Sequence, residues 1–337
     1  MAVHSAQPPP VPDSPKVWAS LITNMSYLPG LLTLHHTLSK TSSAYPFVAI
    51  ITASLPAAAV AALHSRRIPT VTVEPLLPSH AGNYANDPRF RDTWTKLTAF
   101  GLDQFERIVL LDSDMLITKN LDELMDLELD APPRHHGFDG GPGVDGETAQ
   151  LQVKNETTGR RVLAASPACT CNPAHKKHYP ADWVPANCAY TSQHATPDLA
   201  QTRGPERAPL GVLNSGLLVV NPSKFYLSQI TTALEDPATA DMAFPDQDLL
   251  ADLYRDRWVV LPYIYNALKT LRWKGVHDTI WRQDEVKVVH YIWSPKPWSE
   301  RNEDGAWAPS DESHAWWHEA NEARHAEEKR LGLYDGH

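Results

Sequence analysis

Short apolar runs alternate with segments of helical periodicity in the first third of the chain. The runs contain little polar alternation, which is typical of strands that are buried on both faces of a parallel sheet. These predicted strands occupy residues 17–23, 47–52, 70–73 and 108–111. Predicted helices separate or follow them, at residues 28–38, 56–64, 90–105 and 121–129. This alternation indicates βαβ units, so we predict an α/β fold with a mostly parallel central sheet flanked by helices.

A long segment, residues 131–208, interrupts the pattern because it is rich in Pro and Gly and shows no sustained period. Such loops are often functional, so we interpret this segment as a loop-rich insertion or lid. The pattern then resumes, with strands at 211–221, 258–261 and 286–291 and helices at 223–235 and 244–255. A charged helix within 307–331 is predicted to be exposed. We expect a flexible N-terminal tail at 1–16, a single domain at 17–305 and a C-terminal helical extension at 306–337.

Composition and charge argue against several classes of protein. The formal net charge of −10 disfavours a nucleic-acid partner, whose phosphates would be repelled. Residues 1–16 lack the basic start and apolar core of a signal peptide. Pro46 and Pro56 interrupt the one long uncharged stretch, so we predict no membrane span. The three cysteines all lie within residues 169–188, which does not suit a secreted disulfide scaffold, and we expect a cytoplasmic protein.

The run Asp112-Ser113-Asp114 directly follows the predicted strand at 108–111. In open α/β sheets the ligand crevice lies outside the carboxyl ends of the strands, so both carboxylates would reach it. Two carboxylates repel each other and are costly to desolvate unless a cation neutralises them. Hard oxygen ligands of this kind suit Mg²⁺ or Mn²⁺ shared with a phosphate. The alternative is a polar turn whose Asp side chains cap the backbone that follows.

Further polar residues follow or interrupt predicted strands. Asn214-Ser215-Gly216 interrupts one strand, and a Gly there suggests close approach of a ligand or another backbone. Asp246-Gln247 opens a predicted helix, where the alternative role of Asp246 is helix capping. His290 ends the strand at 286–291. We predict that these residues meet Asp112 and Asp114 at one edge of the sheet.

Five motifs in this order resemble glycosyltransferase family 8, the family of glycogenin and galactinol synthase. The motifs are L-x-T-N-x-x-Y from Leu21, T-K-L around Lys96, D-x-D at Asp112, N-x-G at Asn214 with D-Q at Asp246, and H-x(5)-K-P-W from His290. The resemblance implies a GT-A fold, which is a Rossmann-like nucleotide-diphospho-sugar transferase fold. It also implies a UDP-sugar donor, Mn²⁺ (or Mg²⁺) and retention of anomeric configuration.

The resemblance also assigns a role to each matching residue. The uracil and ribose would be surrounded by Leu21, Thr23, Asn24 and Tyr27, and the alternative for Tyr27 is a partly buried core aromatic. The sugar and diphosphate would be contacted by Lys96, Ser113, Asn214, Ser215 and Gly216. The metal would be bound by Asp112, Asp114 and His290. The remaining roles are catalytic: Lys296 would pair with the departing diphosphate, and Asp246 and Gln247 would face the anomeric carbon, as stabiliser or nucleophile.

We therefore expect a metal-dependent retaining hexosyltransferase that uses UDP-glucose or UDP-galactose and an unidentified small-molecule or glycan acceptor. The alternatives are a UDP-sugar nucleotidyltransferase and a catalytically silent sugar-nucleotide binding protein, and the sequence leaves a homodimer open. Two positions depart from the family. Trp293 stands where the family usually has Gly, and Trp273 is the nearest match to the acceptor tyrosine of glycogenin. We expect no self-glucosylation by that route.

The insertion contains its own candidate site. Cys169, Cys171 and Cys188 lie close in sequence to His175 and His178, and such clusters can bind Zn²⁺. The alternative is a packed lid in which the cysteines serve as small apolar residues. Because the insertion follows the D-x-D element, we predict that it shapes the choice of acceptor.

Overall fold

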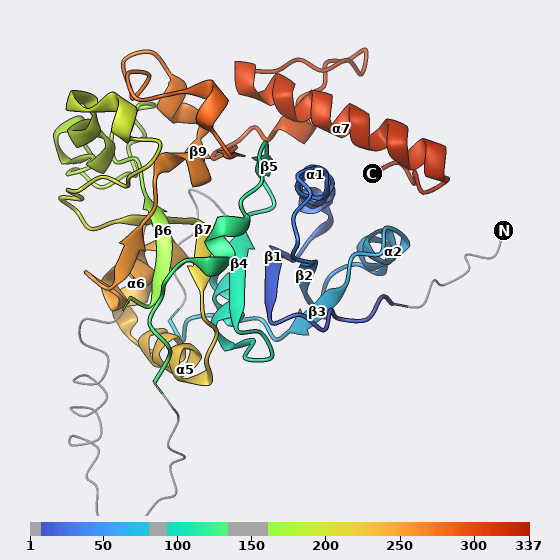
Figure 1. Ribbon diagram of the computed structural model, residues 1–337, viewed down its shortest axis with the longest axis horizontal. Helices are drawn as coiled ribbons and strands as arrows, with labels where there is room; N and C mark the ends of the chain where they lie inside the picture. The colour runs from blue at the N-terminus through green and yellow to red at the C-terminus, as the bar shows by residue number, and fades with distance from the viewer. Residues whose placement is uncertain (1–7, 81–92, 134–160) are drawn as a thin grey trace, which may run out of the picture.

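The computed structural model describes residues 8–80, 93–133 and 161–337, which form two sheets (Figure 1). The larger sheet has seven strands in the order β3-β2-β1-β4-β7-β6-β8. Their bounds are β1 Lys16–Ile22, β2 Phe47–Thr52, β3 Thr70–Val73, β4 Arg107–Leu111, β6 Leu163–Pro167, β7 Leu213–Val220 and β8 Trp258–Val260. The smaller sheet has three strands, β5 Met115–Ile117, β10 Val288–His290 and β9 Ala267–Leu268.

The larger sheet is mostly parallel, as predicted. Parallel pairing joins β3 to β2, β2 to β1, β1 to β4, and β6 to β8. Strand β7 is the exception because it runs antiparallel to both β4 and β6. Its first residues therefore lie beside the carboxyl end of β4, which brings Asn214-Ser215-Gly216 to the Asp112 edge.

Helices cover both faces of the larger sheet. These helices are α1 Leu28–Lys40, α2 Ala57–Ser65, α5 Lys224–Ala233 and α6 Pro245–Leu253, whereas α7 Glu312–Leu331 packs against α1. Trp18 and Ile22 of β1 pack in one apolar cluster with α1 and α2. Val17 and Ala19 pack in a second cluster with α5 and α6. Burial on both faces explains why β1 lacks polar alternation.

Short 3₁₀ segments connect many of these elements. They occupy Met25–Tyr27, Trp94–Gly101, Asp122–Asp126, Pro185–Asn187, Ala189–Ala195, Pro197–Leu199, Pro237–Asp241, Tyr263–Tyr265, Lys269–Arg272, Gln283–Glu285 and Pro297–Ser299. Within the helices predicted at 90–105 and 121–129, residues 94–101 and 122–126 are therefore 3₁₀ rather than α-helical, and residues 90–92 lie outside the described part. Trp94 and Phe100 are fully buried, so packing decides the conformation of their segment rather than helical periodicity.

A strand lies where the hydrophobic pattern predicted none. Strand β6 belongs to the stretch 131–208, of which residues 134–160 lie outside the described part. Its sequence, Leu-Ala-Ala-Ser-Pro, lacks the β-branched and aromatic residues that mark strands in a sequence. Pairing with β7 and β8 on its two sides places it inside the sheet, so long-range hydrogen bonds decide this element.

The C-terminal helix α7 was predicted to be exposed, but one of its faces is buried. Asp311 caps its first turn, and Gly332 ends it in the left-handed conformation. Trp317 is fully buried, and Arg324 is 1% exposed. Two of the charges that suggested exposure, Arg324 and Glu328, are buried and pair with each other. Among the described residues, no helix combines the length and apolar character that a membrane span requires.

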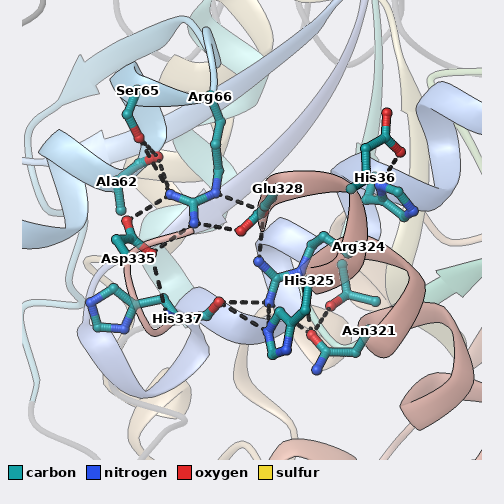
Figure 2. A network of polar contacts seen from close by, with 12 residues as sticks. His36, Ala62, Ser65, Arg66, Asn321, Arg324, His325, Glu328, Asp335 and His337 are labelled. Atoms are coloured by element: carbon teal, nitrogen blue, oxygen red, sulfur yellow. Dashed lines mark hydrogen bonds and ion pairs between the residues drawn. The ribbon is translucent and has the colours of Figure 1, made fainter. Parts of the chain in front are cut away.

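A buried ion network joins α7 to the end of α2 (Figure 2). The Arg66 guanidinium donates to both carboxylate oxygens of Glu328, at 2.8 and 2.7 Å. Arg324 donates to the same carboxylate at 2.7 Å, and Asp335 accepts two further bonds from Arg66. Each charge thus has an opposite partner, which makes the burial of so many charges tolerable.

Candidate active site

One cavity collects the residues that the sequence analysis singled out. It has a volume of about 250 Å³ and lies at the carboxyl end of β4. Its lining includes all fifteen predicted residues: Leu21, Thr23, Asn24, Tyr27, Lys96, Asp112, Ser113, Asp114, Asn214, Ser215, Gly216, Asp246, Gln247, His290 and Lys296. They come from both sheets, since His290 ends β10 of the smaller sheet rather than a strand of the larger one.

The Asp112-Ser113-Asp114 turn connects the two sheets. It leaves β4 at Leu111 and enters β5 at Met115. The backbone N–H of Asp112 donates to Gly216 O at 2.8 Å, and Asp114 O accepts from the backbone N–H of Tyr291 at 2.9 Å. The Ser113 hydroxyl donates to Leu21 O at 2.9 Å and lies 3.1 Å from the Ser20 hydroxyl. These bonds fix both carboxylates, and the Asp side chains do not cap the turn.

Asp112, Asp114 and His290 form a candidate metal centre. One ligand atom from each lies within 4.8 Å of the others. His290 Nε2 is 3.4 Å from Asp114 Oδ1 and 3.8 Å from Asp112 Oδ2. Ligand atoms on neighbouring octahedral positions of a Mg²⁺-sized ion are about 3 Å apart. Two carboxylates and one imidazole therefore fit a Mn²⁺ or Mg²⁺ ion with positions left for phosphate oxygens.

A chain of amide hydrogen bonds orients His290. Its Nδ1–H donates to Asn266 Oδ1 at 2.8 Å, which leaves Nε2 facing the carboxylates. Asn266 Nδ2 donates to Asn214 Oδ1 at 2.7 Å, and Asn214 Nδ2 donates to Gln247 Oε1 at 3.1 Å. The sequence analysis did not select Asn266, which is fully buried. Its place in the run Leu261-Pro-Tyr-Ile-Tyr-Asn was the only available signal.

Gly216 is required by the close approach of His290. A Cβ atom at position 216 would lie 2.4 Å from His290 Cε1 and 2.7 Å from Nδ1. The Gly that interrupts the predicted strand therefore makes room for the imidazole. The sequence analysis expected a close approach at this glycine, and the group that approaches is a protein side chain.

Two buried lysines flank the carboxylates. Lys96 Nζ is 3.0 Å from Asp112 Oδ1 and 2.8 Å from Asp246 Oδ2, and it also donates to Ser215 O at 3.1 Å. Lys296 Nζ donates to Asp114 Oδ2 and, at 2.7 Å, to Tyr291 O. Asp246 thus contacts Lys96 instead of capping α6. The backbone N–H of Phe244, the residue before that helix, donates instead to Asp248 Oδ2 at 2.8 Å.

The two carboxylates of the D-x-D turn differ in acidity. Burial raises the pKa of Asp112, and the attraction of Lys96 offsets this only partly. Burial acts in the same direction on Asp114, but Lys296 and His290 hold the pKa of that carboxyl well below its usual range. Asp114 is therefore ionised throughout the physiological range. Further positive charge at the site would lower the pKa of Asp112.

The segment between β1 and α1 forms one end of the cavity. Asn24 Oδ1 accepts from the backbone N–H of Ser26 at 3.1 Å and so caps a 3₁₀ turn. Tyr27 is only partly buried, which leaves ring surface available to the cavity, and it packs edge-on against Trp298 at 5.5 Å. Gly30 permits this packing, because an added Cβ would lie 2.7 Å from the Trp298 ring.

An aromatic wall that the sequence analysis did not select completes the cavity. We use this name for Tyr179, Trp183, Phe244 and Trp293, which all line the cavity. Trp183 stacks on Phe244 with ring centroids 4.6 Å apart. Trp293 Nε1 donates to Tyr179 Oη at 2.6 Å. The wall joins the stretch 161–208 to the loop after β10, so its members are distant in sequence and share no motif.

Trp293 explains the departure from the family pattern. Its φ of +68° lies in the left-handed region that favours glycine. The loop therefore keeps a glycine-like backbone although a large side chain occupies the position. Contacts hold that side chain, since Lys176 lies over the ring at 5.0 Å in addition to the bond with Tyr179.

The cysteine cluster has a different histidine from the one expected. Cys169, Cys171 and Cys188 gather around His277, whereas His175 and His178 are exposed. Of the histidines that the sequence places near the cysteines, His175 and His178 therefore do not belong to this cluster. The physical reason is that His277 reaches the cluster from a segment after β9, which no local spacing can reveal.

Comparisons with known proteins agree with this geometry. Residues 19–302 match the model of "Glycosyl transferase family 8". The uncharacterized protein R707 of Acanthamoeba polyphaga mimivirus is 25% identical over 83% of this chain and 81% of its own length. Galactinol synthase 1 of Ajuga reptans is 24% identical over 82% of this chain and 72% of its own.

Two solved structures share the fold. The galactosyltransferase LgtC, determined with donor and acceptor sugar analogues, superposes with a TM-score of 0.55 at 15% identity over 91% of this chain and 95% of its own. The bifunctional glycosyltransferase WbbM gives a TM-score of 0.57 at 13% identity over 93% of this chain and 50% of its own, longer chain. At such low identity these likenesses show the GT-A fold alone.

Proposed function

The chain belongs to glycosyltransferase family 8, and from that premise we propose that it is a retaining hexosyltransferase whose donor is UDP-glucose or UDP-galactose. The observation that carries the proposal is the shared cavity of Asp112, Asp114, His290 and the two buried lysines. Three metal ligands and two cations in one cavity suit a diphosphate and its divalent ion. A catalytically silent binding protein would have no evident need for this complete set.

We place the donor along the cavity. The uracil and ribose lie at the end formed by Leu21, Thr23, Asn24 and Tyr27, where a partly buried aromatic ring offers a stacking surface. The diphosphate lies near the D-x-D turn, and the hexose faces Asn214, Ser215 and the first turn of α6. This order supports a role in orienting the sugar for Asn214 and Gln247, because their side-chain amides bond to each other and then to Asn266.

Mn²⁺ or Mg²⁺ held by Asp112, Asp114 and His290 would supply Lewis-acid neutralisation of the diphosphate. Lys296 acts at the same place, since its ammonium can turn from Asp114 to the oxygen that carries new negative charge as UDP departs. Lys96 holds Asp112 and Asp246 in position from the other side. Positive charge therefore surrounds the leaving group.

Retention requires the acceptor to attack from the face that UDP leaves. We propose that the bond from the anomeric carbon to the diphosphate oxygen breaks and the acceptor oxygen bonds to that carbon. The acceptor proton then passes to the departing diphosphate. Asp246 and Gln247 stabilise the cationic sugar between these events. The ion pair between Asp246 and Lys96, 2.8 Å long, supports a stabilising rather than a nucleophilic role for this carboxylate.

The acceptor enters from the side of the aromatic wall, where Trp183 and Trp293 offer apolar faces suited to a sugar or another ring. The protein is not its own acceptor by the glycogenin route, because Trp273 stands at the matching position. Mass spectrometry after incubation with UDP-glucose and Mn²⁺ would contradict this by finding hexose on a tyrosine. The cytoplasmic location and the homodimer stay predictions.

The decisive experiment is a donor panel. UDP-glucose, UDP-galactose and UDP-N-acetylglucosamine are each incubated with the protein and Mn²⁺, and UDP release is measured. We expect metal-dependent release with one of the two hexoses well above the release with the N-acetylated sugar. Binding of every donor without release of UDP would refute the enzyme in favour of a silent binding protein. Consumption of UTP with a sugar phosphate, and release of pyrophosphate, would indicate a nucleotidyltransferase.

A further inference from the structure

A second cluster of metal-ligating side chains lies apart from the D-x-D turn. One ligand atom each from Cys169, Cys171, Cys188 and His277 lies within 4.8 Å of the others. His277 Nε2 is 3.2 Å from Cys171 Sγ and 3.3 Å from Cys188 Sγ. In tetrahedral zinc sites, neighbouring sulfur and nitrogen ligand atoms are roughly 3.5–3.8 Å apart. These two sulfur–nitrogen distances are thus within a few tenths of an ångström of the spacing that zinc needs.

The orientation of His277 supports a ligand role. Its Nε2 faces the sulfurs, and its Nδ1 is 2.9 Å from Nε2 of His194. With Nδ1–H donating to His194, the Nε2 lone pair is available to a metal. Histidine ligands usually have their other ring nitrogen bonded in this way, which fixes the ring and the tautomer. His194 is therefore a supporting residue for the cluster.

Burial favours a structural rather than a catalytic site. His277 is fully buried, Cys188 is 2% exposed, and Cys169 is 8% exposed. Four protein ligands of the Cys₃His type fill all tetrahedral positions and leave none for a substrate. Thiolates are soft ligands that select zinc over the Mn²⁺ or Mg²⁺ preferred by carboxylates. The two clusters therefore differ in the metals that they suit.

We propose that Cys169, Cys171, Cys188 and His277 bind a structural Zn²⁺ ion that fixes the cavity wall. Cys169 and Cys171 follow strand β6, Cys188 directly precedes the 3₁₀ segment Ala189–Ala195, and His277 comes from the segment after β9. In Figure 1 these segments are the yellow-green and orange parts at the upper left. The loop 172–187 starts and ends at zinc ligands, and it carries Tyr179 and Trp183 of the aromatic wall.

Simple packing of small apolar residues explains the cluster less well. Cysteines that serve only as small apolar residues of a core need no imidazole nitrogen aimed between them. A disulfide would use two of the thiols and leave the third beside His277. Zinc uses all four groups, and it would join segments that are 89 and 106 residues apart in the chain.

The test is the metal content of the full-length protein, purified without chelator and without added zinc. Elemental analysis by mass spectrometry should find about one zinc ion per chain. Cys188→Ser should lower that content roughly tenfold or more, because it removes one of four ligands. His178→Ala, in the same loop but exposed, should retain zinc. Asp114→Ala should also retain it, which separates this site from the D-x-D turn.

Replacement of zinc by Co²⁺ in the unmodified protein keeps the test informative if Cys188→Ser fails to fold. Tetrahedral thiolate ligation should give intense visible d–d bands and a thiolate-to-cobalt charge-transfer band. A protein with almost no zinc and three thiols that react freely would overturn the proposal, as would a disulfide between two of the cysteines. Because none of these readouts depends on glycosyl transfer, they are independent of the proposed enzyme activity.

Discussion

Gly216 and His290 are packed so closely that even a methyl group at position 216 would displace the imidazole of His290. Gly216→Ala should push the imidazole away from the carboxylates, since the new Cβ would lie 2.4 Å from His290 Cε1. We expect the Mn²⁺ concentration for half-maximal UDP release to rise about ten- to hundred-fold. A titration of UDP release against Mn²⁺ measures this. An unchanged half-saturation with a normal melting temperature would contradict the assignment of His290.

Replacement of Lys296 should lower the rate of catalysis while leaving donor binding largely unchanged. Lys296→Ala removes the cation beside Asp114, and we expect the rate of UDP release to fall roughly 10²- to 10³-fold. The KM for the UDP-sugar should change much less, because the proposed role of the lysine is to stabilise charge that appears as UDP departs. Lys224→Ala, at an exposed position on α5, is the matched control and should match the original activity. An equal loss in both variants would argue against a specific role.

The sequence was sufficient to identify site residues that belong to a local motif. It was insufficient to identify residues whose role depends on contacts with distant parts of the chain. Asp112 and Asp114 were found because they directly follow a buried strand, and that order is local. Asn266 was missed because its role depends on contacts with His290 and Asn214, 24 and 52 residues away. The conformation of Trp293 also depends on its neighbours, since a left-handed backbone at a large residue is set by contacts rather than by propensity.

At the scale of elements, the C-terminal helix should contribute directly to stability. Glu328→Gln removes the carboxylate shared by Arg66 and Arg324, and we expect a loss of about 3 kcal/mol because two guanidiniums lose a buried partner. Thermal or urea unfolding at neutral pH measures it. Glu319→Gln, on the exposed face of α7, is the control and should change stability little. A similar effect of both changes would contradict the view that this network anchors α7.

Arg66 and Arg324 determine how the contribution of Glu328 to stability changes with pH. Burial acts to raise the pKa of Glu328, but Arg66 and Arg324 hold it below its ordinary value. Because the folded-state pKa is lowered, the contribution is present above the unfolded pKa and is lost as the pH falls through the folded value. The difference between the original protein and Glu328→Gln should therefore shrink in acid.

Asp248, at the start of α6, should make stability depend on pH in the opposite direction. Burial raises the pKa of this carboxyl to about 7, although the bond from Phe244 N–H acts against the shift. A raised folded-state pKa means that the stabilising protonated form is complete below the unfolded pKa and is lost as the pH rises toward 7. Asp248→Asn keeps an oxygen acceptor for Phe244 N–H and cannot ionise.

As the pH rises from 4 to 7, we expect the free energy of unfolding to fall less steeply in Asp248→Asn than in the original protein. The two slopes should differ by up to about 1 kcal/mol for each pH unit. Urea unfolding across this range measures the slope. Parallel stability curves for the two proteins would show that Asp248 titrates at its ordinary value. Any shared slope comes from other groups and cancels in the comparison.

The stretch 131–208 contains a strand of the larger sheet, which limits how much of the stretch can be deleted. Deletion of most of it, which its interpretation as an insertion would suggest, would remove β6 from the middle of the larger sheet. The narrower loop 172–187 is the segment that can be changed without loss of a strand. Since it carries Tyr179 and Trp183, its replacement tests the role of the aromatic wall in acceptor choice.

For the molecule as a whole, the two proposed metal sites should respond differently to a chelator. The D-x-D site lines an open cavity, whereas the cysteine cluster is closed by four protein ligands. Brief treatment with EDTA should therefore abolish UDP release, and Mn²⁺ should restore it, while zinc and the melting temperature stay unchanged. Activity and zinc are measured on the same samples. Loss of zinc together with activity, and recovery only with zinc, would contradict this separation.

The sequence by itself determined the β1–β4 half of the sheet, its covering helices and the position of the D-x-D turn. Apolar runs and helical periods are local signals, and burial on both faces makes them strong. Only the tertiary structure decided the strand at β6, the buried face of α7 and the meeting of His277 with the cysteines. These features depend on partners far away in the chain, and the free energy that selects them comes from contacts that a local pattern does not contain.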